Sequence, residues 1–163
     1  IIDKLCILFN LDYKHSELIC KQSKFVMSNT GRVKNMIDYQ GSHLFSQRLV
    51  EGGLSLTVNG AKRLHQLRSM EIPSKLPDIF APKPGEGPPW IVVNSDAEPF
   101  IEQGRSVMHG FVIAYDSWVR PGEGVLIVNS NGKLLGFGTS QSTCQDLKYF
   151  NKGIAVKVRQ GCP

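Results

Sequence analysis

The sequence predicts an α+β domain followed by a second domain of about six strands with two short helices, on the basis of three observations. Apolar residues at helical spacing begin the chain and are followed by turn-linked segments of alternating polarity. Residues 71–89 contain six prolines, which exclude a regular helix and favour a stiff connection. The last forty or so residues hold a strand, an Asn-Gly turn and a returning strand, the pattern of a hairpin. We therefore expect domains at 1–72 and 90–163, joined by a Pro/Gly-rich linker at 73–89.

The first domain is expected to begin with a helix. Apolar side chains at helical spacing predict it over residues 1–9, whereas residues 18–20 fit either a helix or a strand. Asn59 is expected to cap a second helix, over residues 60–68. Between the two helices, alternation and turn residues predict three strands, at 33–39, 44–50 and 54–58.

The second domain is expected to open with an apolar strand at 90–93. A helix over residues 96–104 follows, because its first turn holds acidic residues and proline and its end is glycine. Residues 105–110 are interpreted as a loop and a strand edge, and residues 111–115 as a strand.

The hairpin of the second domain is the clearest pattern in the chain. A Pro-Gly turn at 120–124 precedes the apolar strand 125–128, which is β-branched at three of its four positions. The Asn-Gly pair at 131–132 suits the turns that close hairpins, and the returning strand spans 133–139.

A short helix and a last strand follow the hairpin. The helix is expected over residues 143–150, capped by Ser142 or Thr143 and ended by Gly153. Residues 154–159 alternate apolar and other side chains, so we expect a half-exposed strand with its basic residues on one face.

Composition and charge narrow the classes of function. Lys and Arg number 19 against 14 Asp and Glu, which gives a formal charge of +5, compatible with nucleic acid but also with many other proteins. The cysteines at 6, 20, 144 and 162 lack metal-ligand spacing, so we expect reduced thiols and no metal or cofactor. No apolar run approaches the ~20 residues that cross a bilayer, and the start shows no export signal. These features favour a cytoplasmic protein that does not bind membranes.

Three pieces of the carboxyl-terminal part resemble the PUA domain, a small RNA-binding β-barrel of pseudouridine synthases and archaeosine transglycosylases. They are the Arg-Pro-Gly-Glu turn at 120–123, the Asn-Gly-Lys-Leu-Leu-Gly-Phe-Gly segment at 131–138 and the closing segment at 150–161. The resemblance implies that residues 90–163 form a PUA-type pseudo-barrel with two short helices.

The first domain resembles the segment that precedes the PUA domain in archaeal archaeosine tRNA-guanine transglycosylase. An Asn-Thr-Gly-Arg turn at 29–32 and a Gly-Ala-Lys-Arg-Leu-His helix at 60–65 occur there in the same order and at similar separation. The likeness continues at 97–100, 104–107 and 111–113, and covers most of the chain from about Ser23 onward. It implies an α+β domain ahead of the PUA domain.

The resemblance leaves out the catalytic part of these enzymes. The catalytic (β/α)₈ barrel of the transglycosylase alone needs ~200 or more residues, and this chain has 163. The Cys-and-Lys motif of the related archaeosine synthase is also missing from this sequence. We therefore expect a non-catalytic, tRNA-binding module, either free-standing or the small subunit of a split transglycosylase or synthase.

The resemblance also implies where RNA binds. PUA domains of this family grip the acceptor stem and the single-stranded CCA end of tRNA, in a groove between the first PUA helix and the adjacent strands. A guanidinium and the backbone N–H groups of a glycine turn suit phosphates, and unpaired ends are bound by stacking and base-edge contacts. The expected RNA-binding residues are Gly104, Arg105, Ser106, Val107, Met108, Gly136, Gly138, Lys152, Lys157 and Arg159.

Each of these residues also has a simpler interpretation. The loop at 104–108 fits an ordinary surface loop, the three later cations fit a solvated strand face, and the two later glycines fit barrel packing. A set of basic residues in the first domain could contact the body of the tRNA. Lys62 and Arg63 equally fit the exposed face of an amphipathic helix, and we favour this second interpretation for the two residues. That set is Arg32, Lys34, Lys62, Arg63 and Arg68.

Two other functions stay open. A ribosome-biogenesis protein that binds rRNA is one, because another two-domain PUA family ends in a similar Leu-Gly-Phe-Gly hairpin; that family lacks the two first-domain motifs. An independent small enzyme is the other, although no nucleophile, phosphate-binding or dinucleotide motif recommends it.

Overall fold

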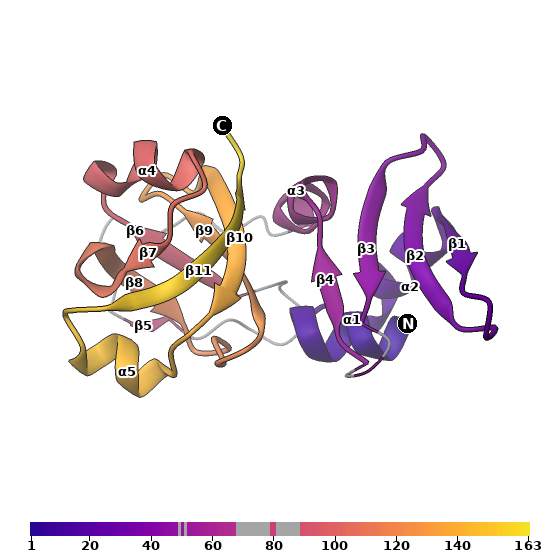
Figure 1. Ribbon diagram of the computed structural model, residues 1–163, viewed down its shortest axis with the longest axis horizontal. Helices are drawn as coiled ribbons and strands as arrows, with labels where there is room; N and C mark the ends of the chain where they lie inside the picture. The colour runs from indigo at the N-terminus through magenta and orange to yellow at the C-terminus, as the bar shows by residue number, and fades with distance from the viewer. Residues whose placement is uncertain (49, 51, 68–78, 81–88) are drawn as a thin grey trace.

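The computed structural model describes residues 1–48, 50, 52–67, 79–80 and 89–163. Within these residues it contains two sheets, one with strand order β1-β2-β3-β4 and one with strand order β5-β8-β6-β9-β10-β11-β7. Figure 1 shows them as two lobes, with helix α3 between them. The lobes correspond to the α+β domain and the barrel domain expected from the sequence.

Two helices begin the first domain, α1 (Ile2–Phe9) and α2 (Tyr13–Lys21). The expected helix over 1–9 is confirmed, and it ends at Asn10 in the left-handed conformation. The ambiguous segment 18–20 is helical, because the Asp12 carboxylate accepts a hydrogen bond from the N–H of His15 at 2.7 Å and caps α2.

An antiparallel sheet and a third helix complete the first domain. The helix is α3 (Val58–Leu67), and the predicted cap at Asn59 was wrong. The hydroxyl of Thr57 accepts from the N–H of Gly60 at 3.1 Å instead, so the helix begins before Asn59. The edge strand β1 pairs with β2 and was not predicted. The strands are β1 (Ser23–Met27), β2 (Val33–Asp38), β3 (His43–Gln47) and β4 (Leu54–Leu56).

The second sheet curls into a pseudo-barrel with the short helices α4 (Glu98–Glu102) and α5 (Cys144–Tyr149) at its ends (Figure 1). This confirms the expected barrel with two short helices. Two 3₁₀ turns, η1 (Ser95–Ala97) and η2 (His109–Phe111), flank α4 and β7. The strands are β6 (Trp90–Val93), β7 (Val107–Met108), β8 (Val112–Asp116), β9 (Gly124–Val128), β10 (Leu134–Ser140) and β11 (Ile154–Gly161).

Two details of the barrel differ from the prediction. Thr143 caps α5 through a capping box with Asp146, but the helix ends at Phe150 and not at Gly153, which lies in the turn before β11. Within the Pro-rich segment, β5 (Ile79–Phe80) pairs in parallel with β8. Neither residue of β5 is proline, so both keep the N–H group that strand pairing needs. The rest of the predicted linker, apart from Pro89, lies outside the described residues.

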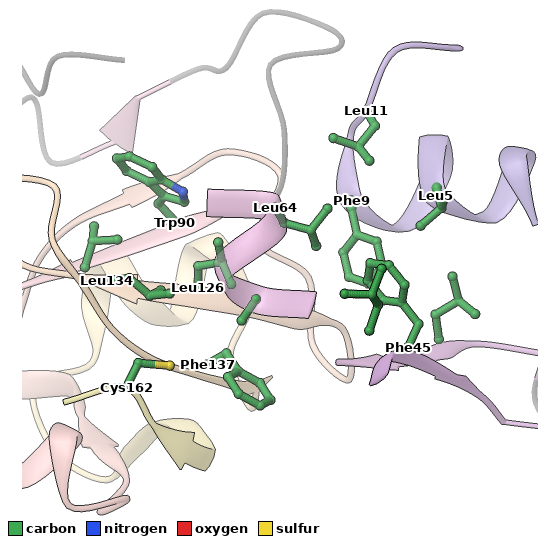
Figure 2. Close-up of a cluster of buried hydrophobic side chains, with 14 of the residues drawn as sticks. Leu5, Phe9, Leu11, Phe45, Leu64, Trp90, Leu126, Leu134, Phe137 and Cys162 are labelled. Atoms are coloured by element: carbon green, nitrogen blue, oxygen red, sulfur yellow. The ribbon is translucent and has the colours of Figure 1, made fainter. Parts of the chain in front are cut away.

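A shared hydrophobic core joins the two domains. Leu64 of α3 is fully buried in one cluster with Phe9 and Phe45 of the first domain and with Trp90 and Leu126 of the barrel. Figure 2 shows Leu64 between these two groups of side chains. The two domains are therefore packed together through α3. The domain boundaries at 72 and 90 stay a prediction.

Among the described residues, none of the helices combines the length and the apolar character needed to cross a bilayer.

Candidate nucleic-acid interface

The loop between α4 and β7 carries the first expected RNA-binding residues. Gly104 is exposed and adopts φ 86°, a conformation that favours glycine. Its N–H donates to the carbonyl of Ile101, and the N–H of Arg105 donates to that of Phe100, both at 2.9 Å. These two N–H groups therefore close the end of α4, and the loop presents chiefly the exposed side chain of Arg105. The Arg105 guanidinium lies 5.6 Å from the ring centroid of Phe100.

Strand β7 alternates between core and surface. The side chain of Val107 is 1% exposed, so it packs in the barrel core and has no surface to offer RNA. Ser106 is half-buried, and Met108 is exposed. Met108 pairs with Ile154 of β11, which is also exposed, so the two side chains form an apolar strip across the strand pair.

Gly136 and Gly138 lie on β10 and are buried against β11. A Cβ at Gly136 would stand 2.9 Å from the carbonyl oxygen of Gln160, and a Cβ at Gly138 would overlap the carbonyl of Lys157. The absence of side chains therefore lets two backbones approach, which is the packing interpretation of these glycines. A direct contact of either glycine with RNA has no structural support.

The expected cations lie along β11 and the turn before it. Lys152, Lys157 and Arg159 are all exposed, and a shift in the register of β11 against β10 places Arg159 at a β-bulge. No ion pair engages any of the three among the described residues. The N–H of His109 donates to the carbonyl of Gly153 at 2.9 Å, which holds the Lys152 turn beside β7. The positive charges of Lys152, Lys157 and Arg159 are therefore available to an anionic partner.

The structure adds two aromatic residues that the sequence analysis did not single out. Tyr149 and Phe150, at the end of α5, are 73% and 58% exposed, although large aromatic side chains usually pack inward. Lys148 lies with its Nζ 5.4 Å from the centroid of the Tyr149 ring, and the Phe150 and His109 rings form a T-shaped pair. The signal in the sequence was the run Lys-Tyr-Phe-Asn-Lys at 148–152, in which two aromatics stand between two lysines.

These residues form one candidate interface around the β7–β11 pair. Figure 1 shows β11 crossing the barrel from the α5 end, with β7 alongside. Cations, exposed rings and an apolar strip together suit a single-stranded nucleic acid, which presents phosphates and unstacked bases. We call this set the β7–β11 surface; it comprises Arg105, Met108, Tyr149, Phe150, Lys152 and Ile154.

The buried side chain of His109 supports the β7–β11 surface. The Nε2 of His109 and the hydroxyl of Ser142 are hydrogen-bonded at 3.0 Å, and His109 is only 7% exposed. Burial lowers the pKa of His109, against a smaller opposing effect of Asp146, so the ring is neutral at neutral pH. Ser142 is buried as well, so no substrate reaches its hydroxyl, and the pair serves to hold β7 to the α5 segment. In the described parts of the chain, no cluster of three His, Cys, Asp or Glu residues could hold a metal ion.

Comparison with protein families gives a match for each domain. A model of the PUA domain matches residues 89–162, and a model of the patch-forming domain C2 of tRNA-guanine transglycosylase matches residues 13–70. The tRNA-guanine(15) transglycosylase of Thermococcus onnurineus is 38% identical over 135 residues, which cover 83% of this chain and 20% of the relative. The protein of the same name from Methanocaldococcus jannaschii is 37% identical over 153 residues, covering 94% of this chain and 21% of the relative. The chain thus spans about a fifth of the length of these relatives.

Comparison with solved structures supports the fold. A hypothetical protein from Pyrococcus horikoshii superposes with a TM-score of 0.65 at 21% identity, covering 99% of this chain and 87% of that one. A conserved PUA domain protein from Thermoplasma acidophilum gives 0.54 at 14% identity, covering 89% and 84%. At these identities the likeness concerns the fold alone.

Proposed function

The chain joins a patch-forming domain C2 of the tRNA-guanine transglycosylase type to a PUA domain, and we propose that it binds tRNA as a non-catalytic module in tRNA modification. PUA domains bind RNA, and the curated relatives modify tRNA. The observation that carries the proposal is the β7–β11 surface, where exposed cations without carboxylate partners lie beside exposed aromatic rings.

In this proposal, the β7–β11 surface grips the acceptor stem and the CCA end. Arg105 and Lys152 bind phosphates, and Lys157 and Arg159 continue the cationic path along β11. Tyr149 and Phe150 offer ring faces on which unpaired bases stack, and each stacked base contributes ~1–3 kcal/mol. Stacking on the rings requires unpaired bases, which the CCA terminus provides, whereas the phosphate contacts can also form along the paired acceptor stem.

The role of the module is positioning. The match covers only 20% and 21% of these two relatives, so most of their length lies outside it. We propose that a separate transglycosylase or synthase subunit supplies the catalysis and that this chain holds the tRNA in register with it. Fixing two reactants in one complex lowers the entropic cost of their encounter.

The test of the phosphate contacts is the salt dependence of tRNA binding. Arg105→Ala and Lys152→Ala should each weaken binding of whole tRNA, and each should lower the slope of log Kd against log salt by about 1. Lys14→Ala, an exposed cation on α2, is the charge-matched control and should leave the slope nearly unchanged. Equal slopes in all three variants would contradict the assignment of phosphates to this surface.

The rRNA alternative is less well supported. The first domain matches the C2 domain of a tRNA-modifying family, whereas a ribosome-biogenesis protein would need only the PUA match. Co-purification with pre-ribosomal particles, in preference to tRNA, would favour that alternative.

A further inference from the structure

A groove in the first domain lies apart from the β7–β11 surface. Helix α3 buries Gly60, Ala61 and Leu64 against the rest of the fold. Its opposite face carries four polar residues at helical spacing, and these line a groove of about 530 Å³; they are Asn59, Lys62, Arg63 and Gln66. The volume lies in the ~300–1,000 Å³ range of small-molecule sites.

The turn between β2 and β3 forms the second wall of the groove. The Asp38 carboxylate accepts hydrogen bonds from the N–H groups of Gln40 and Ser42 at 2.9 and 2.8 Å, and these bonds stabilise the turn. Tyr39 at the tip is 64% exposed, and the Nζ of Lys24 lies 5.6 Å from its ring centroid. This wall therefore presents an exposed ring close to a cation.

The floor of the groove is apolar and fixed. Ile19 and Leu44 are almost fully buried there, and the hydroxyl of Ser23 donates to the carbonyl of Ile19 at 2.6 Å. Gly60 allows close packing of α3 on β3, because a Cβ there would overlap the carbonyl of Leu44. The groove is therefore built by the packing of α2, α3 and the sheet, and its walls are preorganised.

The lining residues offer three kinds of contact. Lys62 and Arg63 supply positive charge, and the Arg63 guanidinium donates to the side-chain oxygen of Gln22, which orients it. The amides of Gln22, Asn59 and Gln66 each supply both a donor and an acceptor. The ring of Tyr39 supplies a stacking face.

This combination matches one nucleotide of RNA. The cations suit its phosphate, the amides suit the edge of its base, and the ring suits the face of its base. An acidic peptide would use the cations and the amides but would place no flat ring against Tyr39, so the exposed ring favours a nucleotide. We propose that the groove between α3 and the β2–β3 turn binds one unpaired nucleotide of the RNA whose end the β7–β11 surface holds. The choice of RNA as the ligand rests on the proposed function, but the site is separate.

The geometry of the domain junction favours one RNA reaching both sites. Helix α3, which forms one wall of the groove, also packs on β10 of the barrel. Lys62 lies near Cys162, where its positive charge opposes the burial that raises the pKa of the thiol. A groove held firmly against the barrel adds its contacts to those of the β7–β11 surface with little further entropic cost.

The test compares two RNAs and two charge-matched variants of the full chain. The variant Lys62→Ala with Arg63→Ala removes the groove cations, and Lys14→Ala with Lys21→Ala removes two exposed cations elsewhere in the same domain. Affinity is measured for whole tRNA and for a CCA-ended acceptor-stem hairpin. The groove variant should lose roughly tenfold affinity for whole tRNA and keep its affinity for the hairpin. The control should lose less than about threefold on both RNAs.

Other outcomes would overturn the proposal. An equal loss for the groove and control variants, or an equal loss on both RNAs, would show that the groove makes no separate contact. Tyr39→Leu removes the stacking ring without a change in charge and should also weaken whole tRNA binding only. If polyglutamate binding required Lys62 and Arg63 while tRNA binding did not, the ligand would be an acidic peptide. Failure of the proposed function differs from all of these results, because the unaltered chain would then bind neither RNA tightly.

Discussion

His65 stacks on Trp90 across the junction of the two domains, with ring centroids 5.5 Å apart and planes inclined by 22°. The Nε2–H of His65 also donates to the carbonyl of Gly132, in the hairpin turn of the barrel, at 2.8 Å. One side chain of α3 thus contacts two separate segments of the barrel. The PUA domain and the domain before it are therefore held in one relative orientation.

This junction predicts that the two domains unfold together. Leu64→Ala should lower the free energy of unfolding by about 2–5 kcal/mol, because it opens a cavity in the shared core. Leu18→Ala, at an exposed position of α2, should change it by less than ~1 kcal/mol. Urea unfolding followed by tryptophan fluorescence and by far-UV circular dichroism should give coincident transitions. Two separate transitions would contradict the shared core.

The glycines of β10 lead to a stability prediction. Gly138→Ala should destabilise the fold by ~1–3 kcal/mol or more, since the added methyl group would overlap the Lys157 carbonyl. Gly110→Ala is the matched control, because a Cβ there meets its nearest atom at 3.5 Å. Thermal unfolding of the two variants distinguishes them. If Gly138→Ala kept the Tm of the unaltered chain but weakened RNA binding, Gly138 would contact RNA and would not serve packing alone.

The buried His109 predicts a pH-dependent stability. Burial lowers its pKa below 6.5, so the unfolded chain binds the proton more readily than the folded chain. The free energy of unfolding should therefore be highest above about pH 6.5 and should fall as the pH drops toward the folded pKa. Urea midpoints between about pH 7 and pH 5 should show a smaller slope in His109→Gln than in the unaltered chain. Identical slopes would mean that His109 titrates normally.

The aromatic residues of the β7–β11 surface predict a contribution to RNA binding that does not depend on charge. Tyr149→Ala and Phe150→Ala should each weaken binding of a short CCA-ended oligonucleotide by about 1–3 kcal/mol, with an unchanged salt slope. Tyr13→Ala, with a ring 60% exposed on α2, is the control for the loss of a surface aromatic. Fluorescence anisotropy measures all three variants. Full affinity in both Tyr149→Ala and Phe150→Ala would show that base stacking on these rings does not contribute to RNA binding.

Much of the fold could be predicted because most barrel elements carry a local signal. The strand 125–128, its Asn-Gly turn and the Thr143 capping box depend on residues close together in the sequence, so pattern and structure agree. The edge strand β1 escaped prediction because its apolar side chains are exposed and do not alternate. The cap of α3 was misplaced by two residues, because Asn59 and Thr57 are both residue types that cap helices.

The functional surfaces were harder to predict than the fold. The resemblance indicated 104–108 as one block, but strand alternation turns Val107 into the core and Met108 outward. Tyr149 and Phe150 ended a predicted helix, and only the structure shows that their rings face solvent. The groove of the first domain brings together residues such as Gln22 and Arg63, 41 positions apart, which no local pattern joins.

The measurement that most directly tests the central claim is the affinity of the unaltered chain for whole tRNA and for the same tRNA without its CCA end. If the β7–β11 surface holds the unpaired terminus, removal of CCA should weaken binding by at least roughly tenfold, since stacked bases contribute ~1–3 kcal/mol each. In Tyr149→Ala with Phe150→Ala, the two RNAs should bind almost equally. Equal affinity of the unaltered chain for both RNAs would contradict the account.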